Sequence, residues 1–575
     1  MTAKITRRTA LATGLAVSAA SCASTPKLTP YSSVGDSSTG IFAHGVASGD
    51  PGADSVVLWT RVTPLEAPSA GSIRVTWEIA ADDAFTDLRG NGETATGASR
   101  DWTVKILTSG MTPGNTYYYR FRIGDTYSPI GRTKSLPAGK IDSARFAVVS
   151  CSNFPFGYFN VYDLISRRDD LDAVIHLGDY IYEYSREGYG GATGAALGRE
   201  HLPAHEIVTL DDYRMRHAQY KADPASQAMH AKHAMIAIWD DHETSNDSWK
   251  GGAENHDGET EGEWNIRRSV ALRAYYEWMP VREPEMTPEA FFRSFSYGDL
   301  LTITAIETRL MARSRQFDYA EVLPTLKTPE DVEHFKNTIL WDETREMLGA
   351  AQIDFIDRTF RKSINDGQPW RLVANQVIMA KMEAPDLTDK IVEEELVELE
   401  KQWAPARAFV KSSALGLPLN FDAWDGYPAA RERFYKMIKS TNDDGMIVVT
   451  GDTHTWWAND LVARDGKHMG VELGVHSITS PSPFRKEFLG GKGAEYSLLT
   501  NQKNKDVRYL TGEHHGYIDL EITHKEARAD FIAVDTIESR DYNAFYKAGF
   551  EIKKTKRGAS FTDTDGLGFK ERILF

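Results

Sequence analysis

Four short apolar segments of the chain end in residues that can bind metal ions. RFAVVSC ends at Cys151, DAVIHLGD at Asp179, AMIAIWDD at Asp240 and Asp241, and GMIVVTGD at Asp452. Thiolates and carboxylates are common metal ligands, and crowded carboxylates repel one another unless cations compensate their charge. The pattern therefore predicts one metal site that is assembled from distant parts of the chain.

Two of these segments continue into motifs that add further ligands. GDYIY adds Tyr182 three residues after Asp179, and WDDHE adds His242 to a crowd of carboxylates. A phenolate ligand favours a strongly charged metal such as ferric iron, because an unperturbed tyrosine has a pKa of about 10. Asn246, close behind, offers a neutral carbonyl oxygen. Taken singly, Tyr182 also fits a packed core aromatic, and WDDHE also fits an acidic turn.

The segment GDTHTWW supplies Asp452 and His454 after another apolar run. Alternate residues of an extended chain point to opposite sides, so these two side chains face different ions only if the backbone turns, as Gly451 permits. Cys151 is the only cysteine beyond the N-terminal signal region. An unpaired cysteine is unusual in an exported protein, and a metal thiolate explains it, although a buried inert cysteine is the commoner state of such a residue.

The elements that must position these ligands form two patterns. From Arg145 onward, continuous apolar runs alternate with polar turns and with helices expected around 265–279 and 393–403. Strands buried on both faces have this character, and α/β folds place their active sites at the carboxyl ends of such strands. Residues 41–137 instead contain alternating segments such as SVVLWTRV and TYYYRFRI, typical of an immunoglobulin- or fibronectin-like β-sandwich. We therefore expect a β-sandwich domain at 41–137 and a catalytic domain at 140–575.

Length and charge limit the classes of partner. The chain has 575 residues, 41% of them apolar, which is enough for two or more domains. Its formal net charge of −16, with no basic cluster, disfavours nucleic acid or an anionic membrane surface as a partner. A surplus of carboxylates suits hard cations, although most of these residues are expected to form a solubilising surface.

The N-terminus carries a targeting pattern. Arg7 and Arg8 precede an apolar and small-residue run, which predicts a twin-arginine signal peptide at 1–26 that hands the chain to the twin-arginine export machinery. Cys22 is either a lipidation site or part of a plain cleavage region, and residues 27–40 read as a flexible tether. The expected location is periplasmic or secreted, with membrane attachment only through a lipid anchor at Cys22.

In combination and order, the motifs resemble the PhoD-type alkaline phosphatases and phosphodiesterases of the metallophosphoesterase superfamily. FAHGVASGDPGADSVVLWTRV resembles the start of that family's N-terminal domain. The catalytic segments are matched in order by VVSCSNFPFGYFNVY, IHLGDYIYEY, TLDDYRMRHAQYKADP, IWDDHE, RRSVALRAYYEWMPVR, DAWDGYPAAR and GDTHTWW. The resemblance covers nearly the whole chain, and it implies an α/β (α+β) metallophosphoesterase four-layer sandwich that follows the N-terminal β-sandwich.

The resemblance also implies the cofactors Fe³⁺ and Ca²⁺. Carried onto this sequence, it assigns iron to Cys151, Asp179, Tyr182 and His454. It assigns calcium to Asp179, Asn246 and Asp452, with Asp240 and Asp241 nearby. The softer ligands thus gather on the transition metal, whereas carboxylate and amide oxygens suit calcium.

The implied reaction is an in-line displacement by a metal-bound hydroxide, without a covalent enzyme intermediate. His242 is expected to protonate the leaving alkoxide or to polarise the phosphate. Alternatively, it does not contact the substrate and orients a metal-binding carboxylate. Arg267 and Arg268 begin a helical pattern, and an arginine fork fits phosphate geometry. The resemblance favours Arg268 as a substrate-binding residue, whereas Arg267 fits a surface position equally well.

Some features depart from the family pattern. Glu307 in AIETR stands where an aspartate is expected, and Asn375 falls roughly where the wider superfamily has another histidine ligand. The helix at 393–403 and the tail GLGFKERILF have no counterpart in the motifs that carry the resemblance.

Three functions remain in view. The first is extracytoplasmic hydrolysis of small-molecule phosphate monoesters and diesters with release of phosphate. The second is a phospholipase D-like diesterase that acts on phospholipid headgroups at the same site. The non-enzymatic alternative is a surface adhesion or carbohydrate-binding protein with a relic catalytic domain.

Overall fold

The computed structural model describes residues 41–64, 71–284, 291–402 and 406–562. The expected signal peptide at 1–26, the tether at 27–40, Cys22 and the tail GLGFKERILF lie outside these residues. In the described part of the chain, none of the helices has the length and apolar character that crossing a bilayer requires.

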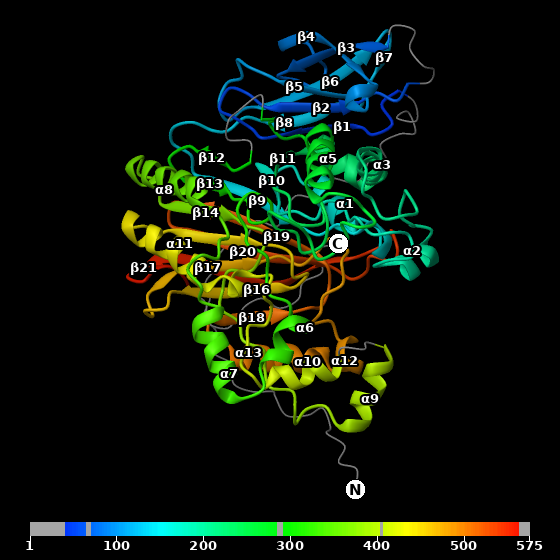
Figure 1. Cartoon of the computed structure of the whole chain (residues 1–575). Helices are drawn as coiled ribbons and strands as arrows, with labels where there is room; N and C mark the ends of the chain where they lie inside the picture. Colours follow the sequence, from blue (N-terminus) through cyan, green and yellow to red (C-terminus); the bar gives the residue numbers. More distant parts are fainter. Residues whose placement is uncertain (1–40, 65–70, 285–290, 403–405, 563–575) are drawn as a thin grey trace, which may run out of the picture.

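Two large sheets form the centre of the molecule (Figure 1). The ten-stranded sheet contains, in spatial order, β22 (Gly558–Phe561), β21 (Ala544–Thr555), β20 (Glu526–Val534), β19 (Gly516–Thr523), β9 (Ser143–Val149), β10 (Ala173–His176), β11 (Ala234–Ala237), β1 (Val46–Gly49), β2 (Val57–Arg61) and β5 (Thr103–Leu107). The seven-stranded sheet contains β12 (Arg293–Tyr297), β13 (Leu301–Ala305), β14 (Trp370–Ala374), β15 (Met446–Thr450), β17 (His468–Gly474), β16 (Trp456–Val462) and β18 (Val507–Thr511). Strands such as β13 (LTITA) and β15 (MIVVT) are buried throughout, which explains their continuous apolar sequence.

The two sheets pack face to face, and helices cover their outer faces. Val148 and Ile175 of one sheet share a core with Val449 of the other. Outside the ten-stranded sheet lie α1 (Asn160–Ser166), α4 (Pro224–Lys232) and α5 (Trp264–Trp278). Outside the seven-stranded sheet lie α8 (Ala350–Asn365) and α11 (Pro428–Thr441). The result is the four-layer arrangement that the sequence analysis predicts.

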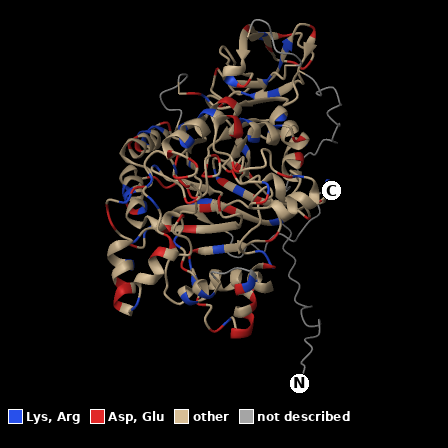
Figure 2. Cartoon of the chain, turned by 45° about the vertical axis from the view of Figure 1, so that its right-hand side comes forward, with Lys and Arg blue, Asp and Glu red and all other residues tan. Residues whose placement is uncertain are grey.

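The remaining α-helices lie around this sandwich. They are α2 (Gly191–Leu197), α3 (Leu210–Lys221), α6 (Tyr319–Val322), α7 (Pro329–His334), α9 (Glu393–Gln402), α10 (Ala406–Ser413), α12 (Phe488–Gly491) and α13 (Gly493–Lys503). The helix expected at 393–403 is therefore α9, and with α10, α12 and α13 it forms a cap at the lower end of the molecule in Figure 1. Figure 2 shows Lys and Arg positions interspersed with Asp and Glu positions along the chain.

The N-terminal strands join the catalytic sheet. A third sheet, of five strands, is made of β4 (Leu88–Gly97), β3 (Ser72–Ala80), β6 (Thr116–Ile123), β7 (Thr126–Tyr127) and β8 (Gly131–Lys134). It packs through Tyr117, Tyr119 and Phe121 against β1, β2 and β5, which belong to the ten-stranded sheet. Strand β1 runs parallel to β11, with Ser48 opposite Ala234. Three strands of the 41–137 region therefore belong to the main sheet of the catalytic region. The change of sequence pattern near residue 140 does not reveal this shared sheet.

Candidate metal centre

The carboxyl ends of four strands meet between the two large sheets. β9, β10 and β11 are parallel neighbours in one sheet, and β15 lies in the other. Cys151, Asp179, Asp240 and Asp452 follow these strands directly. Ligand atoms lie within 4.8 Å of one another in three groups, namely Cys151 with Asp179 and His454, Asp179 with Asp241 and His242, and Asp240 with Asp241 and Asp452. The groups share Asp179 and Asp241, so two cation positions can adjoin.

Two glycines let the strand ends come this close. A Cβ on Gly178 would lie 2.5 Å from the backbone nitrogen of Asp240, and one on Gly451 would lie 2.8 Å from the Cβ of Ser150. Gly178 also has a φ of 105°, which disfavours any larger residue. Glycine in GDYIY and GDTHTWW is therefore needed because the backbones of separate strands touch at these positions.

Tyr182 completes the softer group of ligands. Its hydroxyl donates to Asp179 Oδ2 at 3.0 Å and lies 3.2 Å from His454 Nε2. The hydroxyl of Ser480 donates to Tyr182 Oη at 2.7 Å and so holds the ring in place. The structure therefore brings together all four residues that the family resemblance assigns to iron.

Several ligand residues have a left-handed backbone. The φ angle is 60° at Cys151, 55° at Asp179, 60° at Asp452 and 52° at His454. Residues other than glycine rarely adopt this conformation, and such strain concentrates at functional sites. The turn expected at Gly451 is thus made by Asp452 and His454 themselves, which allows both side chains to reach the same cavity.

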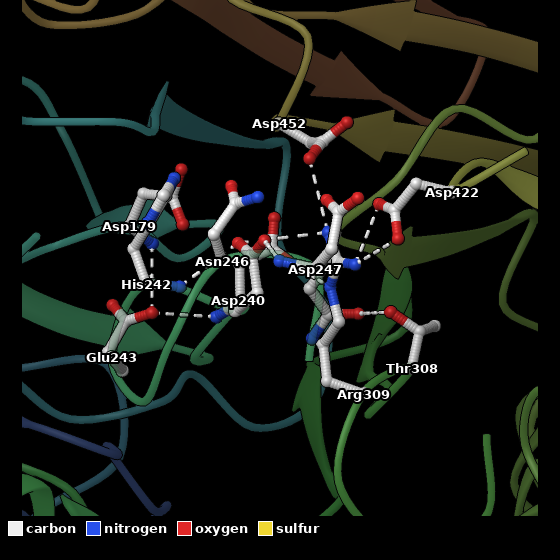
Figure 3. Close-up of polar contacts among 12 residues, drawn as sticks. Asp179, Asp240, His242, Glu243, Asn246, Asp247, Thr308, Arg309, Asp422 and Asp452 are labelled. Carbon is white, nitrogen blue, oxygen red and sulfur yellow. Dashed lines mark hydrogen bonds and ion pairs between the residues drawn. The ribbon is translucent and has the colours of Figure 1, made fainter. Parts of the chain in front are cut away.

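The second group consists of carboxylates, with Asn246 beside it (Figure 3). Burial raises the pKa of Asp240 to about 7, against the opposing attraction of Arg309. Asn246 lines the cavity above the group, and its amide nitrogen donates to Glu254 at 3.0 Å. Of the residues that the family resemblance places at or near calcium, Asp179, Asp241, Asn246 and Asp452 line the same cavity, and Asp240 adjoins Asp241 and Asp452.

Arg309 lies among these carboxylates, and the sequence analysis did not single it out. Its Nε donates to Asp240, its Nη1 donates to both oxygens of Asp422 at 2.7 Å, and its Nη2 donates to Asp452 at 3.1 Å. Asp241 lies 3.8 Å from Nη2. One buried guanidinium thus offsets part of the charge of four acids. Asp422 begins DAWDGYPAAR, one of the segments that carry the family resemblance. That motif is the feature of the sequence that could have pointed to this acid.

The two positions that depart from the family pattern have structural contacts. Glu307 is buried and accepts hydrogen bonds from Trp239 Nε1 at 3.0 Å and from the backbone nitrogen of Arg309 at 2.9 Å. It therefore fixes the turn that presents Arg309. The amide nitrogen of Asn375 donates to the carbonyl of Val377 at 2.6 Å, and the described cavity lining does not include Asn375.

His242 is oriented by a carboxylate that the sequence analysis did not identify. Its Nδ1 lies 2.7 Å from Glu183, and its ring stacks on Tyr182 with centroids 4.2 Å apart. Burial would lower the pKa of His242, but Glu183, Asp241 and Asp179 outweigh it and raise that pKa well above its usual value. Glu183 lies four residues after Asp179 in GDYIYEY, so it belongs to a recognised motif.

Glu243, the last acid of WDDHE, holds loops together. Its carboxylate accepts the backbone N–H groups of Asp179 at 3.0 Å, Tyr180 at 2.6 Å and Asp240 at 2.8 Å. These contacts join the turns after β10 and β11. Glu243 therefore positions two ligand residues through their backbone.

The two arginines assigned to substrate binding have other contacts. Arg267 is buried and donates to Glu261 at 2.7 Å and to Glu206 at 2.8 Å. Arg268 donates to the backbone carbonyl of Lys250 at 2.9 Å. Among the described residues that line the cavity, neither arginine occurs. In this structure Arg309 is the arginine that contacts the carboxylates of the ligand cluster, through Asp240 and Asp452.

A cavity of about 320 Å³ opens onto the ligands. Its floor is polar and includes Asp179, Asp241, His242, Asn246, Asp452 and His454. The rest of the lining is largely apolar and includes Phe409 of α10, Phe488 of α12 and Tyr496 of α13. The cavity therefore combines the candidate ligands with an apolar surface in a volume that suits a small molecule.

The donor atoms fit bound cations. Asp179 Oδ1 and Asp240 Oδ2 are buried without hydrogen-bond partners in the described part of the chain, although buried carboxylate oxygens are normally paired. Burial and then the charge of Asp179 raise the pKa values of the Cys151 thiol and the Tyr182 hydroxyl well above their usual ranges. A cation at this point would satisfy the free oxygens and stabilise the ionised thiolate and phenolate.

Comparisons with known proteins agree with this geometry. The chain is 32% identical over 533 residues to alkaline phosphatase D of Bacillus subtilis (strain 168), covering 90% of this chain and 82% of that protein. A solved structure titled "Structure of PhoD" superimposes with a TM-score of 0.73 at 29% identity, covering 92% of this chain and 93% of that one. The predicted four-layer fold is therefore confirmed.

Family patterns cover both parts of the chain. The pattern of the PhoD-like phosphatase family matches residues 146–531. The pattern of the PhoD-like phosphatase N-terminal domain matches residues 29–137. With the candidate ligands already at one site, these matches show that the chain is a hydrolase that belongs to the PhoD-like phosphatase family.

Proposed function

We propose that the chain hydrolyses phosphate monoesters and diesters outside the cytoplasm and thereby releases phosphate. The observation that carries this proposal is the pair of adjoining ligand groups, which share Asp179 and Asp241 at the floor of one cavity. The likeness to alkaline phosphatase D supports phosphate esters as substrates. We assign Fe³⁺ to the group with Cys151 and Ca²⁺ to the carboxylate group, because thiolate suits the transition metal and oxygen ligands suit calcium.

The residues of the chain have distinct tasks in this proposal. Bound cations would supply charge neutralisation for the phosphoryl group and would acidify a water molecule. Glu183 holds Nδ1 of His242, so the imidazole faces the cavity in a fixed orientation and can pass a proton to the leaving oxygen. Arg309 limits the repulsion among the carboxylates.

Metal analysis tests the assignment of the ions. Protein purified without chelator is expected to contain iron and calcium and to show visible absorption from phenolate-to-iron charge transfer. Tyr182→Phe keeps the packed ring and is expected to lose that absorption. Two zinc ions without iron would contradict the assignment of Cys151 and Tyr182.

Substrate assays test the reaction. We expect the loaded enzyme to hydrolyse a simple aryl phosphate and its bis-aryl diester, and the chelated enzyme to hydrolyse neither. Activity that persists after complete removal of the metals would contradict the proposal. An adhesion or carbohydrate-binding protein would be inactive with its metals loaded, and the intact ligand set argues against that alternative.

Location is tested at the N-terminus. Replacing Arg7 and Arg8 by lysine is expected to retain the precursor in the cytoplasm, because twin-arginine export depends on the arginine pair. Cell fractionation with an activity assay measures this. Cys22→Ser separates lipid attachment from simple cleavage, since only a lipoprotein would move from the membrane to the soluble fraction.

A further inference from the structure

The cavity that opens onto the ligands has an aromatic wall. Phe409 of α10, Phe488 of α12 and Tyr496 of α13 line it, together with Phe484 and Trp457. These rings come from the cap and from the segment after the ligand loop, so they lie far apart in the sequence. A phosphate group alone would need only the polar floor.

The rings form one packed surface. Phe484 stacks on Tyr496 with centroids 5.0 Å apart and planes 11° apart, and it meets Trp457 edge-on at 5.5 Å. The ring centroids of Phe409 and Phe488 lie 6.0 Å and 5.9 Å from that of Tyr496. Such contacts hold aromatic rings in defined positions. The wall is therefore one connected aromatic surface.

The wall is joined to the ligand loop. The indole nitrogen of Trp457 donates to Thr453 Oγ1 at 2.9 Å. Thr453 lies between Asp452 and His454, and it also lines the cavity. The aromatic wall and the segment that carries Asp452 and His454 therefore line the same cavity and are joined by a hydrogen bond.

We propose that this wall binds the apolar alcohol portion of the phosphate ester and selects small esters with an aromatic or compact alkyl group. The inference rests on the proposed function and adds the substrate class to it. The cavity of about 320 Å³ lies at the lower end of the range of about 300–1,000 Å³ for small-molecule sites, so it suits a compact ester rather than a diacyl lipid. Burial of apolar surface against the rings supplies the preference.

A ratio of two substrates tests the wall. We compare kcat/KM for 1-naphthyl phosphate with kcat/KM for glycerol 1-phosphate in the metal-loaded full chain. Phe409→Ala is expected to lower the ratio by about 10- to 100-fold, since it removes apolar contact with the naphthyl group alone. The ratio does not depend on the fraction of folded enzyme, so a partly unfolded variant still gives an answer.

A matched variant provides the control. Phe292 is also a half-buried phenylalanine packed against the same core, and its ring centroid lies 5.0 Å from that of Phe355. It is absent from the described cavity lining. Phe292→Ala is expected to leave the ratio within about 2-fold of the wild type. A fall of equal size in both variants would overturn the wall as the cause.

The remaining outcomes separate the inference from the proposed function. An unchanged ratio in Phe409→Ala, or a wild-type ratio near one, overturns the wall alone. Faster hydrolysis of phosphatidylcholine vesicles than of 1-naphthyl phosphate overturns the choice of a compact ester in favour of a lipid. Failure of the loaded wild-type chain to hydrolyse either soluble ester overturns the proposed function itself.

Discussion

At the residue scale, the ligands are held in conformations that cost free energy. Each left-handed residue among Cys151, Asp179, Asp452 and His454 costs about 1–3 kcal/mol. The surrounding fold supplies this energy through contacts such as the Glu243 carboxylate, which binds three backbone amides. These contacts offset part of the cost of the strained conformations at Asp179 and its neighbours.

Removing Arg309 should expose the mutual repulsion of the acids. We expect Arg309→Met to lower the free energy of unfolding of the chelated protein by about 3–5 kcal/mol, because buried carboxylates lose their counter-charge. Added Ca²⁺ should restore part of that loss. Urea denaturation with and without calcium measures both effects.

Arg293 provides the comparison for Arg309. It is buried and pairs with Asp50 at 2.6 Å, at a position outside the ligand groups. Arg293→Met should destabilise the protein too, but calcium should not restore it. If calcium rescued both variants equally, the effect at Arg309 would be non-specific.

Lys221 should make stability depend on pH. It is 1% exposed, its Nζ lies 2.7 Å from His230, and burial lowers its pKa well below 10.5. Between that lowered pKa and 10.5 the unfolded chain binds a proton that the folded chain does not, so wild-type stability rises with pH. The free energy of unfolding of Lys221→Met minus that of the wild type should therefore fall by about 1.4 kcal/mol per pH unit as pH rises toward 10.5.

Denaturation series at several pH values between 8 and 10.5 measure this difference. A difference for Lys221→Met that grows with pH would have the wrong sign for a buried neutral lysine.

Some site residues could be predicted from the sequence, and others could not. Cys151, Asp179, Asp240 and Asp452 were identifiable because each follows an apolar strand, and strand ends converge in α/β folds. Arg309 lies in a turn whose approach to the acids depends on how the two sheets pack. Such long-range contacts leave no local periodicity in the sequence.

At the scale of elements, the site depends on how closely strand ends approach. Gly451→Ala places a methyl group 2.8 Å from the Cβ of Ser150, so β15 must move away from β9. We expect a loss of about 1–3 kcal/mol in the free energy of unfolding and weaker metal retention against a chelator. Gly258→Ala is the control, because its nearest atom is 3.8 Å away. Equal metal retention in both variants would show that the spacing of these ends is unimportant.

Strand positions were more predictable than strand partners. TYYYRFRI corresponds to β6, and the helix expected at 265–279 corresponds to α5 at Trp264–Trp278. These elements follow from apolar spacing within a few residues. The pairing of β1 with β11 joins residues almost 190 positions apart, which local patterns do not record.

At the scale of the whole molecule, the ten-stranded sheet joins both regions of the chain. Two further contacts join the N-terminal region to the catalytic region. They are the buried ion pair of Asp50 with Arg293 and the hydrogen bond from Trp59 Nε1 to the carbonyl of Glu277. We therefore expect the N-terminal and catalytic regions to unfold together, in one cooperative transition that calorimetry can measure. Two well-separated transitions would mean that the N-terminal region unfolds independently.

The shared sheet has a consequence for proteolysis. A nick in the loop between β8 and β9 would cut the chain where no ladder pairing is lost, so both fragments should remain associated and co-purify. Forced separation would strip β11 of its neighbour and leave an unprotected edge, a template for intermolecular strand pairing. We therefore expect the N-terminal strands to protect the catalytic sheet from aggregation, because β1 covers the edge of β11.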